Sequence, residues 1–272
     1  MKHEWKYAAV VLALVAVAPG YAAETVLPQS ALVPDGNYYT NSIGSNTLAR
    51  NDDGSTNSVP FGFNFTLFGA TYSGGYINNN GNITFTGPLS SYVPNGVLGA
   101  NQPIVSTYFA DVDTRNVESG LLHWQLDTAG QLVATCDNVG YYSGHADLLN
   151  SFQLVLRGDN FAVPEGEGRV GFFYRQMPWI TTNTSVTAAA GFGDGAGNGF
   201  TIEGSNSATF NTVLQNHHIW FDVAGGGVIV VPPEPPIVGA VPEPATGALL
   251  AIGMGWMGYI SRRKKKVKAT AA

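Results

Sequence analysis

Alternation between apolar and polar residues dominates the middle of the chain, which is the pattern of half-buried β-strands. Residues 61–67 alternate three phenylalanines and a leucine with glycine, asparagine and threonine. Asn80 and Gly81 separate two further runs, 76–79 and 82–85, and both residues accept the positive φ of a hairpin turn. Other strands are expected at 104–109, 121–126, 132–136, 151–156, 170–174, 186–190, 200–202 and 218–223.

Sustained helical periodicity does not occur in this region, and turn-rich segments separate the short strands. The spacing predicts an all-β fold, a single antiparallel β-sandwich or barrel-like domain over residues 24–223. With 272 residues, of which 44% are hydrophobic, the chain is long and apolar enough to bury a core.

The first 23 residues have the layout of a secretory signal peptide. Lys2 and Lys6 give a basic start, and an apolar run follows over residues 7–18. Small residues around Ala22 provide a cleavage site, and the apolar run is too short to span a bilayer. We therefore predict a signal peptide at 1–23 and export of the domain that follows.

The C-terminal end combines a linker, an apolar run and a basic tail. Residues 224–240 are rich in proline and glycine, which predicts an extended linker. Residues 245–261 are almost all apolar or small and predict a short transmembrane helix. By the positive-inside rule the basic tail stays cytoplasmic. It consists of Arg262, Arg263, Lys264, Lys265 and Lys266, with Lys268 beyond them.

Residues 241–268 resemble the PEP-CTERM sorting signal of Gram-negative bacteria, which has a Pro-Glu-Pro motif, a short membrane helix and a basic tail in this order. The motif here is Pro242, Glu243 and Pro244. The resemblance implies processing by exosortase, an integral-membrane protease. It also implies tethering at the inner membrane before processing, then a place at the cell surface or in the extracellular matrix. A second Pro-Glu-Pro at 233–235 leaves open which copy is used, and contact with the apolar run favours the later one.

Several blocks of the middle region resemble the nidogen-like (NIDO) extracellular domain, in the same order. They lie at 76–85, 103–115, 137–142 and 150–156, within a match that runs from about residue 51 to 223. One departure is Cys136, which stands where the family usually has tryptophan before its Asp-Asn-Val block. No catalytic activity is attached to the family. The resemblance therefore implies an adhesive or structural extracellular role, and the chain is not expected to be an enzyme.

Charge is distributed unevenly along the chain. The net charge is −6, yet residues 24–244 contain five arginines, no lysine and 18 acidic residues, which gives −13. An acidic body excludes nucleic acid as the main partner. It also repels anionic polymers unless cations bridge them. The lone Cys136 excludes a disulfide scaffold, and its apolar surroundings predict a small buried residue rather than a nucleophile.

Calcium is the candidate cofactor, at one of two places. Asp111 and Asp113 lie two residues apart at the end of an expected strand, where side chains at i and i+2 face the same side. Asp52 and Asp53 belong to a second oxygen-rich loop, 51–57, and calcium takes six to eight oxygen ligands. The alternative is that these residues only cap the backbone of turns.

The combined hypothesis is an exported surface or matrix protein, adhesive or structural in an exopolysaccharide or biofilm matrix. Its partners would be exosortase, extracellular polysaccharide or matrix proteins, and the membrane through the C-terminal helix. A calcium-dependent glycan-binding module is the first alternative, and a matrix hydrolase is the second. Aromatic side chains that could stack on sugars if exposed are Tyr38, Tyr39, Tyr141, Tyr142 and Trp179.

Overall fold

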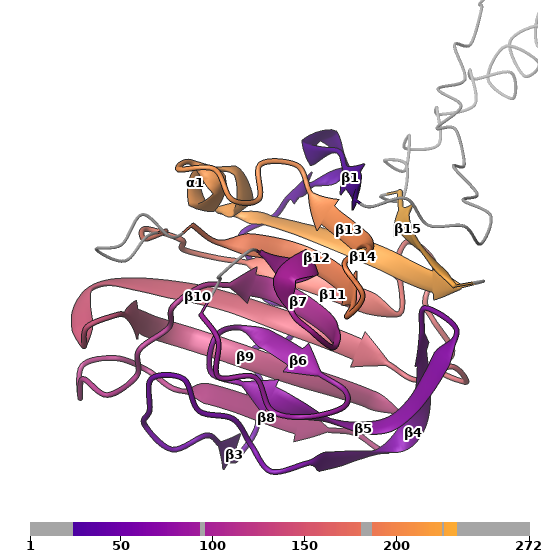
Figure 1. The fold of residues 1–272 in the computed structure, drawn as a ribbon, viewed down its shortest axis with the longest axis horizontal. Helices are drawn as coiled ribbons and strands as arrows, with labels where there is room; N and C mark the ends of the chain where they lie inside the picture. The colour runs from indigo at the N-terminus through magenta and orange to yellow at the C-terminus, as the bar shows by residue number, and fades with distance from the viewer. Residues whose placement is uncertain (1–23, 93–95, 181–186, 225, 233–272) are drawn as a thin grey trace, which may run out of the picture. The chain divides into compact units, whose positions relative to one another are not determined.

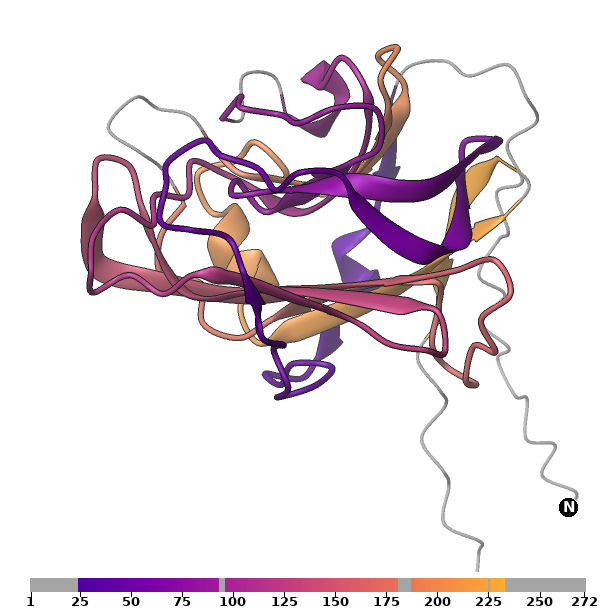
Figure 2. The ribbon, with the colours of Figure 1, turned by 90° about the horizontal axis from the view of Figure 1, so that it is seen from below.

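Two β-sheets packed face to face make up the part of the chain that the structure, a computed structural model, describes: residues 24–92, 96–180, 187–224 and 226–232. Figure 2 shows the two layers nearly edge-on. Neither sheet closes on itself, so the all-β prediction is confirmed as a sandwich and not as a barrel. The predicted signal peptide, sorting motif, transmembrane helix and basic tail lie outside the described residues.

The first sheet has seven strands, and all the pairings given for it are antiparallel except that of the first strand, which runs parallel to its neighbour. Its order across the sheet (Figure 1) is β1 (Glu24–Leu27), β13 (Gly199–Ile202), β12 (Ala189–Asp194), β7 (Pro103–Phe109), β6 (Asn82–Thr84), β5 (Ala70–Asn78) and β4 (Val59–Leu67).

The second sheet has eight strands and contains the two longest, which pair as a hairpin. Its order is β15 (Gly227–Val231), β14 (His217–Ala224), β11 (Val170–Tyr174), β10 (His145–Arg157), β9 (Gln131–Tyr141), β8 (Leu122–Leu126) and β3 (Asn46–Thr47), while β2 (Val33–Pro34) pairs with β14. Three short helices lie between strands: η1 (Gln29–Ala31), η2 (Val97–Gly99) and α1 (Phe210–Leu214).

Aromatic side chains from both sheets meet in the core. Phe172 of β11 stacks on Phe192 of β12, with ring centroids 5.5 Å apart, and Phe221 of β14 packs edge-on against both. All three are fully buried. Because burial of one such side chain contributes about 1.5–3 kcal/mol, contacts of this kind between the layers hold the sandwich together.

The outer face of the second sheet is also buried around β10. Val155 joins Val133, Phe173 and Trp220 in a separate small apolar cluster. A segment that follows β2 covers part of this face, since Gln153 donates a hydrogen bond to the Thr40 carbonyl and accepts one from its amide. Strand β10 is therefore enclosed on both faces, which explains why eight consecutive residues of it are buried.

Several elements differ from the prediction. The strand expected at 186–190 is β12, which begins at Ala189 and runs to Asp194, into the glycine-rich stretch. The linker predicted from 224 begins too early, because β15 pairs with β14 as the last strand of the second sheet. The short helix α1 was not predicted, since five residues are too few to display a helical period. In the described ranges, no helix has the length and apolar character needed to cross a bilayer.

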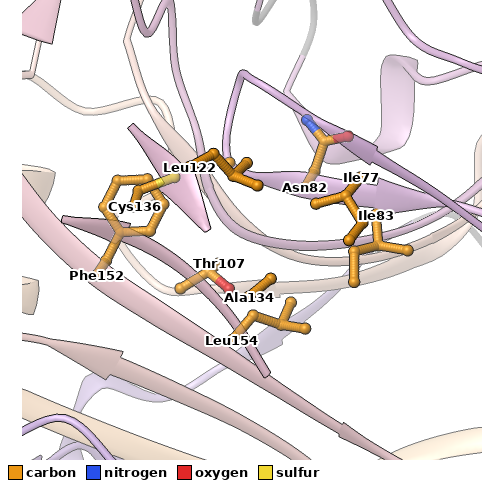
Figure 3. Close-up of a pocket in the computed structure, with 10 residues that line it drawn as sticks. Ile77, Asn82, Ile83, Thr107, Leu122, Ala134, Cys136, Phe152 and Leu154 are labelled. Carbon is orange, nitrogen blue, oxygen red and sulfur yellow. The ribbon is translucent and has the colours of Figure 1, made fainter. Parts of the chain in front are cut away.

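A small cavity lies between the sheets (Figure 3). Its lining is mainly apolar, its volume is about 20 Å³, and Cys136 and Phe152 contribute to its wall. That volume suits about one water molecule, so it is too small for a ligand. Burial raises the pKa of the Cys136 thiol well above its usual value, as expected for a structural residue rather than a nucleophile.

Candidate functional site

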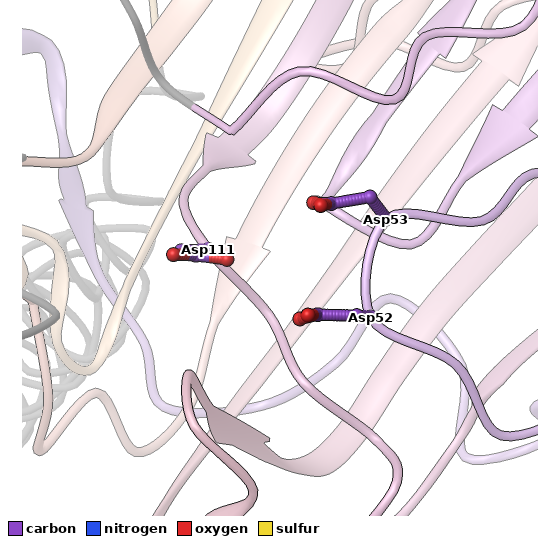
Figure 4. Close-up of side chains that lie close together, drawn as sticks. All are labelled: Asp52, Asp53 and Asp111. Carbon is purple, nitrogen blue, oxygen red and sulfur yellow. The ribbon is translucent and has the colours of Figure 1, made fainter.

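Three carboxylates from two distant segments meet at one end of the sandwich (Figure 4). Asp52 and Asp53 lie in the loop between β3 and β4, and Asp111 lies two residues after the end of β7. One oxygen from each lies within 4.8 Å of the others. We call these three residues the carboxylate cluster. It combines both aspartates of the 51–57 loop with only one, Asp111, of the second place at which the sequence suggested calcium.

The turn between β5 and β6 holds the two segments together. The side-chain amide of Asn79 donates hydrogen bonds to the carbonyls of Asp52, at 2.6 Å, and Val112. The side-chain Oδ1 atom of Asn80 accepts from the Val112 amide at 2.9 Å, and its side-chain NH₂ group donates to Asp53 Oδ1 at 2.8 Å. Asn79 and Asn80 are almost fully buried, so this asparagine clamp fixes the loop against the end of β7.

Asp111 is the most enclosed member of the carboxylate cluster. It is 6% exposed, and no hydrogen bond or ion pair from the described residues reaches its carboxylate. Burial first, and then the negative charges of Asp52 and Asp53, raise the pKa of Asp111 to about 7. The unbalanced charge therefore makes ionised Asp111 costly in the absence of a cation.

Asp52 is only partly compensated. Arg115 pairs with its Oδ2 atom at 2.9 Å, but Oδ1 is buried and has no hydrogen-bond partner among the residues that the structure describes. Burial, followed by the charges of Asp113 and Asp53, raises the pKa of Asp52 to about 6. One oxygen of this carboxylate thus remains without a donor.

The carboxylate of Asp113 is fully hydrogen-bonded, and this residue is not a member of the carboxylate cluster. Its fully buried carboxylate accepts hydrogen bonds from the amide and Nε of Arg115 and from the Gly144 amide. Burial alone raises the pKa of Asp113, but the hydrogen bonds from Arg115 and Gly144 outweigh it and lower the pKa. The expected sharing of one face by Asp111 and Asp113 fails because the strand ends at Phe109 and the chain turns there.

The carboxylates open into a pocket of about 130 Å³. Its walls are formed by Asp53, Asp111, Tyr92 and Tyr142. The two tyrosines are 45% and 39% exposed, so their rings are available to a ligand. Sequence reasoning had singled out Tyr142 and missed Tyr92, for which no motif gives a signal.

The other aromatic candidates are largely buried. Tyr38 and Trp179 are less than 10% exposed, and the Trp179 indole donates to the Val139 carbonyl inside the core. Tyr39 packs on the apolar cluster of the outer face, and Tyr141 lies partly buried between Trp179 and His145. Of the five aromatic candidates, Tyr142 alone is exposed among the described residues.

Comparison with known proteins gives two family matches. A model described as NIDO related matches residues 33–229, and one described as the PEP-CTERM protein-sorting motif matches residues 240–266. Alpha-tectorin of Gallus gallus is 26% identical over 208 residues, covering 62% of this chain and 9% of the relative. Nidogen of Drosophila melanogaster is 25% identical over 222 residues, covering 62% of this chain and 16% of the relative. The chain thus spans only a small part of either relative. No solved structure matches.

Proposed function

Because the chain belongs to the NIDO-related family and carries a PEP-CTERM protein-sorting motif, we propose that it contributes adhesion or structure to an extracellular polysaccharide matrix. The sorting motif marks it as an exported protein that exosortase processes. The observation that carries the proposal is this pairing in one chain, with the NIDO-related domain directly before the sorting motif. In this proposal the domain is not an enzyme, and its partners are matrix polysaccharides or matrix proteins.

The acidic body fits a matrix role better than direct adsorption to an anionic polymer. Residues 24–244 hold 18 acidic residues against five arginines. Such a surface stays soluble at high local concentration and associates with anionic chains only through bridging cations. A cell that produces the matrix but lacks this protein should show weaker matrix cohesion, restored by the wild-type chain. Unchanged cohesion and adhesion in such cells would argue against the proposal.

Replacement of Pro242, Glu243 and Pro244 by alanine should abolish sorting. The expected result is an unprocessed chain that stays in the membrane fraction, because exosortase no longer recognises the motif. Immunoblots of membrane, surface and medium fractions measure this. The matched control replaces the earlier copy at 233–235, which should leave processing intact. Normal processing of the first variant, or loss of processing only in the control, contradicts the assignment of the later copy.

A second candidate function is glycan binding at the pocket. It is favoured by the two exposed rings of Tyr92 and Tyr142 beside two carboxylates, since exposed aromatic faces stack on sugars. Replacing both tyrosines by alanine should weaken retention of the full chain on a host-polysaccharide affinity gel at least about tenfold. The control is Leu126→Ala, an exposed apolar side chain on β8. Equal retention of both variants, with or without calcium, would remove this candidate.

A further inference from the structure

We propose that Asp52, Asp53 and Asp111 bind one calcium ion. This inference is independent of the matrix role, since a calcium site in this position would exist whatever the exported protein binds. It also differs from the two separate places indicated by the sequence, because the structure takes one carboxylate pair and a single residue of the other. Water molecules would complete the coordination on the side of the pocket.

The donor set is the first argument. Three carboxylates present oxygens within 4.8 Å of one another, a separation that a single ion bridges when each oxygen lies 2.3–2.6 Å from it. Carboxylate oxygens are ligands for hard cations, and neither cysteine nor histidine belongs to this group. Calcium accepts such irregular, water-completed oxygen sets more readily than magnesium, which demands near-octahedral geometry.

The second argument is that polar atoms at the centre have no partner. Asp111 is 94% buried, and no donor in the described part of the chain reaches its carboxylate. Asp52 Oδ1 is also buried without a partner. Buried carboxylate oxygens are ordinarily hydrogen-bonded or coordinated. An unpaired Asp111 carboxylate and an unpaired Asp52 Oδ1 atom in the same cluster therefore indicate a missing positive charge.

The nearby cation does not supply that charge. Arg115 is committed to Asp113 through its Nε and Nη2 atoms, and it reaches only the Oδ2 atom of Asp52. Asp53 receives its one hydrogen bond from a neutral amide, that of Asn80. A divalent ion would reduce the surplus negative charge where Arg115 does not reach.

Hydrogen bonds within the protein already hold the two segments of the site together. Asn79 and Asn80 hold the loop and the end of β7 in place through hydrogen bonds that leave the cluster oxygens free, apart from Asp53 Oδ1. The amide of Tyr142, at the tip of the β9–β10 hairpin, donates to the Asp111 carbonyl at 3.2 Å. An ion at the carboxylate cluster would therefore cross-link the β3–β4 loop and the segment after β7, which the asparagine clamp already aligns. The tip of the β9–β10 hairpin lies beside them.

The test is thermal unfolding of the full chain at pH 8 after removal of metals with EDTA, repeated with CaCl₂ or MgCl₂. Calcium at one hundred times its Kd should raise Tm by about 5–10 °C, and calorimetry should give a Kd of about 10⁻⁴–10⁻³ M. Asp111→Asn should unfold at a higher temperature than the wild type in EDTA, because it removes a buried uncompensated charge. The same variant should lose the calcium response.

Glu165→Gln is the matched control, because Glu165 is exposed and remote from the cluster in sequence. It should keep the full calcium response. In EDTA the Tm of Asp111→Asn should exceed that of the wild type, and in calcium the wild type should have the higher Tm. This reversal distinguishes loss of calcium binding from a general loss of stability. No Tm rise in the wild type, an equal rise with magnesium, or a retained response in Asp111→Asn overturns the proposal.

Discussion

Replacing Arg157 by alanine is expected to lower the free energy of unfolding by about 3–5 kcal/mol. Arg157 lies at the end of β10, and its side chain is fully buried. Its guanidinium donates to Gln131 Oε1 at 2.8 Å, to the Gly168 carbonyl at 2.9 Å and to the Glu167 carboxylate. Alanine would leave the Gln131 and Gly168 acceptors and the Glu167 carboxylate, which is 28% exposed, without the donor that the buried guanidinium provides.

The aromatic surroundings add to the loss. Arg157 Cζ lies 4.4 Å from the ring centroid of Trp220, 4.7 Å from that of Phe161 and 5.3 Å from that of Tyr39. These rings form a cage around the guanidinium plane, and cation–π contacts are strongest where water is excluded. Lysine should restore little stability, because its ammonium cannot reproduce the planar fork that reaches all three acceptors.

Arg169→Ala provides the control for Arg157. Arg169 pairs with Asp222 at 2.7 Å, but both side chains are partly exposed, at 25% and 38%. A pair of this kind contributes less than about 1 kcal/mol. Urea denaturation of the two variants measures the difference. Equal losses for Arg157→Ala and Arg169→Ala would show that the buried network contributes no more than a surface pair.

Long alternating segments were the part of the fold that the sequence predicted well. Strand β4, Val59–Leu67, carries its own alternation of phenylalanine with smaller or polar residues, so its position can be predicted without the rest of the chain. The short strands do not carry a pattern. β1 has four residues and is fixed by parallel pairing with β13, far along the sequence, and β3 has only two. Their existence follows from tertiary pairing, which local propensity does not encode.

The site was predicted only in fragments, for a related reason. Asp52 and Asp111 lie 59 positions apart in sequence, and nothing in either segment indicates the other. Asn79 and Asn80 connect them, yet before Gly81 they resemble ordinary turn residues. Their buried amide groups make the connection, and that burial is visible only once the sheet is assembled. Asp113 lies outside the cluster because β7 ends at Phe109, and the sequence alone does not show where this strand ends.

Gly81→Ala is expected to lower the free energy of unfolding by about 2–5 kcal/mol. Gly81 has a φ of +73°, and a Cβ atom there would lie 2.2 Å from the Tyr108 carbonyl oxygen. The left-handed conformation costs about 1–2 kcal/mol for a residue with a side chain, and forced overpacking costs about 1–3 kcal/mol more. The turn cannot easily move away, since the Gly81 carbonyl accepts the amides of Thr107 and Tyr108.

Gly69→Ala separates the two contributions. Gly69 also has a positive φ, +80°, in the turn between β4 and β5, but no atom of the described residues lies within 4 Å of its added Cβ. The free energy of unfolding of Gly69→Ala should therefore fall only by the cost of the left-handed conformation, about 1–2 kcal/mol. Because Gly81 directly follows Asn79 and Asn80, Gly81→Ala should also displace the asparagine clamp and reduce the calcium-induced rise in Tm, whereas Gly69→Ala should keep it. Equal stability losses and equal calcium responses in the two variants would show that the turn does not position the carboxylates.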